Sequence, residues 1–184
     1  MSATNDLRTI GVLGGMSSES TITYYRQIDQ GINEALGGHA AGDLLIRSVN
    51  FGDIERFIRT GQWEKAEDYV VEAAQDLEAG GAEFIIMATN TMHRLAPAIV
   101  SELSIPFIHI VDVAADAIRE ADIETVGLLG TQATMEESFY RERLANHGID
   151  VVVPDQTNRE AVDRIIFEEL TEGITREASR ERYL

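Results

Sequence analysis

The sequence predicts an α/β fold with two similar lobes, each a mainly parallel sheet flanked by helices. Short apolar runs alternate with longer segments of helical spacing along the 184 residues. This is the pattern of strands that are buried on both faces and joined by crossover helices. A strand and glycine turn at residues 9–14 recurs at 125–130. Together these observations predict a first lobe at 1–110 and a second at 111–184.

The expected strands, in chain order, are 9–13, 44–49, 84–88, 107–110, 125–129 and 151–153. The expected helices are 20–36, 63–79, 94–103, 113–121, 136–147 and 159–170. Apolar residues fall at helical intervals in 63–79, and Gly80-Gly81 ends that helix. Strands that alternate with helices of this length predict right-handed crossovers and a parallel sheet.

The internal repeat extends beyond the strand. Each copy is followed by a helix with an aromatic-Tyr-Arg triplet, Tyr24-Tyr25-Arg26 in the first lobe and Phe139-Tyr140-Arg141 in the second. By the same repeat, the second-lobe counterpart of strand 84–88 would fall near residue ~204. We therefore expect the second lobe to be incomplete in this chain.

Composition excludes several classes of function. Fifteen basic and 32 acidic residues give a net charge of −17, so a nucleic-acid partner is not expected. The chain has no cysteine, which excludes disulfides and thiolate metal sites. No apolar run approaches the ~20 residues of a membrane span and no signal peptide is recognisable, so we expect a soluble cytoplasmic protein.

The first candidate site is the glycine turn Gly14-Gly15-Met16-Ser17. Backbone N–H groups at such a turn, together with the helix that follows, favour an anion. The glycine spacing is not that of dinucleotide folds, and Asn50 stands where they place an acidic residue. The turn therefore suits a carboxylate or phosphate better than a nicotinamide cofactor. An ordinary strand–helix turn remains the alternative.

The second candidate is Thr89-Asn90-Thr91, which follows Ala88 at the end of a buried strand. Ligands of open α/β sheets bind at that edge, although these residues could equally cap a helix. His93 lies one turn further and could act as a base, but a lone histidine is more often structural.

Two further candidates complete the set. Thr131 and Thr134 occupy the repeat's counterpart of the first turn. Arg47 lies among apolar strand residues and needs a carboxylate partner, from the protein or from a substrate. The four histidines are scattered, so no metal site is predicted.

Five segments together resemble the aspartate/glutamate racemase family, most closely its broad-specificity amino-acid racemases. They are GVLGGMSSESTITYYR (11–26), ATNTMH (88–93), IPFIHI (105–110), LLGTQATMEESFYRERL (128–144) and IFEEL (166–170). The resemblance implies two pseudo-symmetric lobes with the active site between them, a homodimer and no cofactor. It also implies two cysteines, one at the end of the third strand of each lobe, that act as acid and base on opposite faces of the substrate α-carbon.

The sequence departs from that family pattern at one decisive position. The first family cysteine maps onto Ala88, and the second would lie past Leu184. An engineered substitution, drift towards a binding role or a single-base reaction would each explain Ala88. We expect a racemase that is inactive or altered in this form, with Ala88 and Thr89 at the catalytic position. The substrate-binding residues implied are Met16, Ser17, Arg47, Thr89, Asn90, Thr91, Thr131 and Thr134. The alternatives are a non-catalytic amino-acid or dicarboxylate binding protein and a related isomerase such as maleate isomerase.

Overall fold

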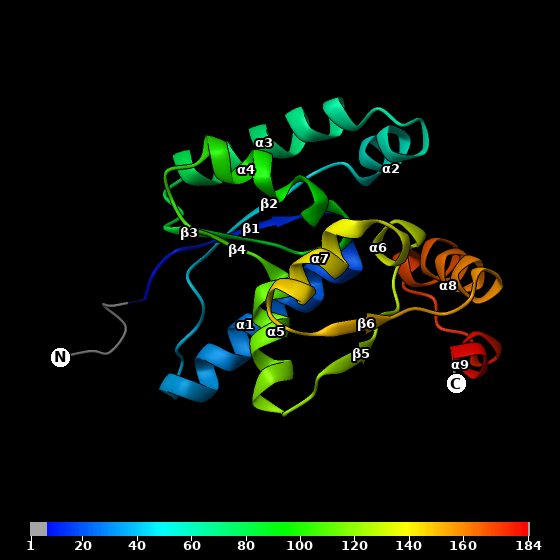
Figure 1. Ribbon diagram of the computed structural model, residues 1–184. Helices are drawn as coiled ribbons and strands as arrows, with labels where there is room; N and C mark the ends of the chain where they lie inside the picture. The colour runs from blue at the N-terminus through cyan, green and yellow to red at the C-terminus, as the bar shows by residue number, and fades with distance from the viewer. Residues whose placement is uncertain (1–6, 184) are drawn as a thin grey trace. The chain divides into compact units, whose positions relative to one another are not determined.

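Parallel strands alternate with helices in the computed structural model, which describes residues 7–183 (Figure 1). The predicted α/β class is confirmed. The chain divides into two compact units. Unit 1 comprises residues 7–89 and Leu95–Ile108, and unit 2 comprises Asn90–Arg94 and residues 109–183.

Unit 1 contains a four-stranded parallel sheet in the order β2-β1-β3-β4. Its strands are β1 (Ile10–Gly14), β2 (Leu44–Ser48), β3 (Phe84–Met87) and β4 (Phe107–Ile108). In the register, Leu13 lies between Arg47 and Met87. β1 is central and almost wholly buried, because it is an apolar run with strands on both sides and helices on both faces.

The helices of unit 1 are α1 (Ser18–Leu36), α2 (Phe51–Arg59), α3 (Trp63–Ala79) and α4 (Ala96–Glu102). α3 packs on β1, β2 and β3, and α1 lies on the opposite face of the sheet (Figure 1). The strand order explains this arrangement. The step from β1 to β2 and the step from β2 to β3 run in opposite directions, so right-handed crossovers place their helices on opposite faces.

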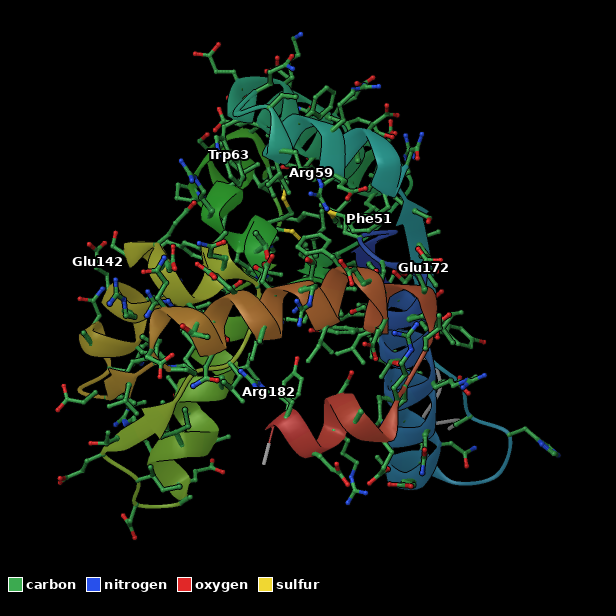
Figure 2. The ribbon with its side chains drawn as sticks, turned by 90° about the vertical axis from the view of Figure 1, so that its right-hand side faces the viewer. Phe51, Arg59, Trp63, Glu142, Glu172 and Arg182 are labelled. Carbon is green, nitrogen blue, oxygen red and sulfur yellow. The ribbon has the colours of Figure 1, made fainter. Side chains whose placement is uncertain are left out.

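Several elements of unit 1 and its C-terminal boundary differ from the sequence prediction. α2 was not predicted, although Asn50 caps it by accepting from the Gly52 amide at 3.1 Å. Figure 2 shows Phe51 and Arg59 on this helix and Trp63 at the start of the next. The helix predicted at 94–103 is a 3-10 turn (Thr91–Leu95) followed by α4, whose first turn contains Pro97. The strand predicted at 107–110 ends at Ile108, because His109 caps α5.

Unit 2 is built around a two-stranded parallel sheet. Its elements are α5 (Ile110–Glu120), β5 (Thr125–Gly127), α6 (Gln132–Glu136), α7 (Ser138–Asn146), β6 (Asp150–Val152), α8 (Gln156–Glu168), a 3-10 turn (Leu170–Glu172) and α9 (Glu177–Tyr183). The helix predicted at 136–147 is two helices, because Glu137 adopts an extended conformation. Val111, Ala115, Tyr140, Leu144 and Ile149 form the core beneath the sheet.

Two negative findings apply to residues 7–183. Among them, no helix has the length and apolar composition needed to cross a bilayer. Within the same range, no group of three or more His, Asp or Glu side chains is placed to hold a metal ion.

Candidate functional site

The glycine turn after β1 is held by hydrogen bonds within the turn itself. The Gly15 amide donates to Thr21 Oγ1 at 2.8 Å, and that hydroxyl donates to the Ser17 carbonyl at 2.9 Å. Ser17 caps α1 by accepting from the Ser20 amide at 3.5 Å. Met16 and Ser17 are each 7% exposed. The amide of Gly15, predicted to face an anion, therefore already has an acceptor inside the protein.

The end of β3 places Ala88 and Thr89 in different environments. Ala88 is completely buried, its amide donates to the Leu13 carbonyl at 2.9 Å, and its carbonyl accepts from Ser20 Oγ at 2.8 Å. Thr89 is only partly buried. It is therefore the first residue after β3 whose side chain has an exchangeable hydroxyl proton and is partly exposed.

Arg47 finds its carboxylate within unit 1. Its Nε donates to Asp76 Oδ2 of α3 at 2.9 Å, and its Nη1 donates to the Ser48 carbonyl at 3.2 Å. The two ionic side chains are 38% and 54% exposed. Of the two partners that the sequence allowed for this arginine, the structure supplies the one from the protein.

The hydroxyl groups of Thr91, Thr131 and Thr134 converge in unit 2. Thr91 Oγ1 lies 2.8 Å from Thr131 Oγ1 and 3.3 Å from Thr134 Oγ1, and the last two oxygens are 3.1 Å apart. Thr131 caps α6, and its hydroxyl also accepts from the Thr134 amide at 3.3 Å. Two segments about 40 residues apart in the chain thus present three hydroxyls at one point. Each hydroxyl has one proton, and a hydroxyl that does not donate within the group can donate to an anionic oxygen. Thr134 is 2% exposed, whereas Thr91 and Thr131 are only partly buried and can be reached by a ligand.

Asn90 stands beside this group of hydroxyls in the chain. Its side-chain oxygen Oδ1 accepts from the Tyr140 hydroxyl at 3.3 Å. Tyr140 is 8% exposed and belongs to the core of unit 2. Burial raises the pKa of this phenol, so it stays protonated as a hydrogen-bond donor.

His93 is packed against a second histidine. The rings of His93 and His109 meet edge to face with centroids 4.6 Å apart, and the two residues are 2% and 5% exposed. His93 Nε2 accepts from the Ile110 amide at 3.3 Å, and His109 Nδ1 accepts from the Val111 amide at 3.2 Å. Burial first, and then the Arg143 charge, lower the pKa of His109 to about 4. Both rings accept a hydrogen bond from the first turn of α5, and the low pKa of His109 keeps its ring neutral at pH 7.

An ion-pair cluster lies next to the histidines. Arg143 donates to both carboxylate oxygens of Asp112 at 2.6 Å, and His147 Nε2 lies 3.1 Å from Asp112 Oδ1. The hydrogen bonds from Arg143 hold the pKa of Asp112 at about 2. This carboxylate is fully ionised at neutral pH and has protein partners on both oxygens.

Comparison of the sequence with known protein families shows to which family this chain belongs. The sequence pattern shared by Asp/Glu/hydantoin racemases matches residues 13–184. The chain is a member of the Asp/Glu/hydantoin racemase family.

Two solved structures and one curated protein illustrate this membership. A candidate Asp/Glu racemase of Yersinia pestis is 46% identical to this racemase-family chain, with a TM-score of 0.87 over 96% of this chain and 77% of that one. An aspartate racemase homologue of Pyrococcus horikoshii is 36% identical, with a TM-score of 0.79 over 91% and 74%. A broad-specificity amino-acid racemase of Bacillus subtilis is 28% identical over 85% of this chain and 69% of its own length.

The sequence did not single out every residue of the candidate site. Thr91, Thr131 and Thr134 were predicted and lie together in unit 2, while Arg47 belongs to β2, an edge strand of the sheet in unit 1. Tyr140 was missed as a contact of Asn90. The aromatic-Tyr-Arg triplet marked its position in the repeat, but a repeat carries no information about which hydroxyl meets which amide.

Proposed function

We propose that this chain carries the amino-acid site of a cofactor-independent racemase that acts on aspartate, glutamate or a similar amino acid. The observation that supports this best is the convergence of the Thr91, Thr131 and Thr134 hydroxyls within 3.3 Å of one another. In the proposed reaction, these donors hold the α-carboxylate of the substrate. Charge that develops on the carboxylate when the α-proton leaves is stabilised by the same donors.

Racemisation requires proton removal on one face of the α-carbon and proton delivery on the other. We assign one of these transfers to Thr89, which directly precedes Asn90 in the chain. Position 88, where the family resemblance places a cysteine, is buried in unit 1 with both backbone groups bonded. A hydroxyl is a much weaker acid than a thiol of pKa about 8.5, so the proposed activity is altered and slow rather than typical of a thiol enzyme.

The expected behaviour of Thr89 variants follows from this assignment. The measurement is exchange of the α-proton of L- and D-glutamate and of L- and D-aspartate in deuterated water, followed by proton NMR. We expect slow exchange in the unmodified chain, none in Thr89→Val, and faster exchange in Thr89→Cys because a thiolate forms near pH 8.5. Ala88→Cys is the matched control, and its buried thiol should give no acceleration. Acceleration in Ala88→Cys but not in Thr89→Cys would move the proton transfer to position 88.

A second candidate function is a non-catalytic binding protein for amino acids or dicarboxylates. The absence of cysteine from the 184 residues favours it. Glutamate and succinate, titrated separately into the chain by calorimetry, distinguish the candidates when combined with the exchange assay. Binding of either ligand without exchange in any variant supports the binding protein. In both cases Thr131→Val should weaken binding about 10- to 150-fold, because it removes a charge-assisted hydrogen bond.

A further inference from the structure

Asn90 and Tyr140 form a contact with a definite direction. A carboxamide oxygen only accepts, so the Tyr140 hydroxyl must donate its proton to Asn90 Oδ1 across the 3.3 Å between them. The two hydrogens on Asn90 Nδ2 then point away from Tyr140. Asn90 is exposed, and among residues 7–183 its Nδ2 has no hydrogen-bond acceptor.

The opposite orientation of the amide is unfavourable. If the amide turned over, Nδ2 would donate to the phenol oxygen and the phenol proton would lose its acceptor. Tyr140 is only 8% exposed and lies among Val111, Ala115, Leu144 and Ile149, which offer no polar side chain. A buried donor without an acceptor costs about 1–3 kcal/mol. The core of unit 2 therefore selects one orientation of a surface amide.

We infer that Tyr140 is a positioning residue, which turns the Asn90 amide nitrogen outward as a fixed donor for the carboxylate of an amino-acid ligand. The inference rests on the proposed function for the identity of the ligand. A fixed donor matters because a freely rotating amide presents its oxygen to the carboxylate part of the time and repels it. The Thr91 hydroxyl, one residue along the chain, adds a second donor of the same kind.

The internal repeat shows that this contact is specific to unit 2. Tyr25 occupies the counterpart of Tyr140 in the first aromatic-Tyr-Arg triplet. It is 46% exposed, and its hydroxyl has no hydrogen-bond partner among the described residues. The same position in the repeat therefore carries a solvent-facing tyrosine in unit 1 and a buried, directional donor in unit 2. Tyr25→Phe is accordingly the matched control for Tyr140→Phe.

The first test needs no ligand. In ¹⁵N-labelled protein, the side-chain amide of Asn90 should give a large heteronuclear NOE, as expected of a rigid group. Tyr140→Phe keeps the aromatic ring in the core and should reduce that NOE markedly, whereas Tyr25→Phe should leave it unchanged. An Asn90 amide that is equally mobile with and without the Tyr140 hydroxyl overturns the inference. This outcome does not depend on whether the chain binds amino acids.

The second test is a double-mutant cycle on glutamate affinity. Tyr140→Phe should weaken binding roughly three- to tenfold in the native background and not at all in the Asn90→Ala background. Equal weakening in both backgrounds would show that Tyr140 acts only through the core, and would overturn the inference.

Should Tyr140→Phe fail to fold, Asn90→Asp tests the same point. It keeps an acceptor for Tyr140 but turns a carboxylate oxygen outward, so glutamate binding should fall more than tenfold without a change in Tm, and unchanged binding overturns the inference. If glutamate binds to none of the proteins while the Asn90 amide is rigid, the proposed function fails and the directional contact stands.

Discussion

Gly15 has a backbone conformation and a packing environment that exclude any side chain. Its φ is +89°, and a Cβ atom at this position would lie 2.3 Å from the carbonyl oxygen and 2.6 Å from the amide nitrogen of Val49. These contacts are with backbone, which cannot rotate away as a side chain can. The turn that carries Met16 and Ser17 therefore depends on this glycine.

Replacement of Gly15 by alanine should be far more costly than replacement of another left-handed glycine. Gly61 has a φ of +68° and open space around its Cβ position, so Gly61→Ala adds only backbone strain of about 1–2 kcal/mol. Gly15→Ala adds the same strain and the overlap with Val49, which costs roughly a further 1–3 kcal/mol. Urea denaturation of both variants measures the difference in the free energy of unfolding. Equal losses would show that the turn moves away from Val49 without cost.

At the scale of single elements, α5 depends on a histidine that must stay neutral. His109 caps α5 through Nδ1, and burial holds its pKa at about 4. Asp112 and a hydrogen bond to the His93 backbone act in the opposite direction, but burial and Arg143 prevail. The unfolded chain binds a proton near pH 6.5 whereas the folded chain does not.

The pH dependence of stability follows from that difference. The contribution of neutral His109 is complete above pH 6.5 and is lost as the pH falls towards 4, because protons favour the unfolded chain. Between pH 7 and pH 5 the free energy of unfolding should fall by roughly 2 kcal/mol because of this residue. His109→Asn keeps a capping acceptor and cannot be protonated, so its stability should fall less over this range. Chemical denaturation of both proteins at several pH values measures the free energy of unfolding. If this free energy fell equally with pH in both proteins, the prediction for His109 would be wrong.

The same scale shows what the sequence could and could not predict. The span of α3 was predicted to the residue, because its apolar spacing and the Gly80-Gly81 stop are local signals. α2 was missed because Asn50 was interpreted as the end of a strand rather than as a cap. The partner of Arg47 lies 29 residues away in Asp76, and that of Asn90 lies 50 residues away in Tyr140. Local patterns identify residues that need partners, but only the tertiary structure determines which partners they obtain.

At the scale of the whole chain, the net charge of −17 opposes folding through self-repulsion. Acidic side chains are distributed along the helices, including Glu142 and Glu172, which Figure 2 labels in unit 2. Salt shortens the range of this repulsion from about 10 Å at 0.1 M to about 3 Å at 1 M.

Sodium chloride should therefore stabilise the protein. We expect Tm to rise by several degrees between 0.05 and 1 M salt, since each kcal/mol of relieved repulsion adds about 2–4 °C in a chain of this size. The control variant carries Glu67→Gln, Asp68→Asn and Glu72→Gln, three exposed α3 residues without ion pairs among the described residues. It should melt higher than the native chain at low salt and gain less from added salt. Differential scanning calorimetry measures both, and an identical gain in the two proteins would rule out charge repulsion as the cause.

The five residues Asn90–Arg94 belong to unit 2, although they are preceded and followed by chain that belongs to unit 1. On the ribosome they emerge long before the side chains that will enclose them. Met92 and His93 are 1% and 2% exposed in the finished fold, while Tyr140 is synthesised about 50 residues later. At a synthesis rate of about 5–20 residues per second, this segment waits roughly 2–10 seconds for its neighbours. A gene split at residue 110 would therefore separate Asn90–Arg94 from the rest of the unit to which these residues belong.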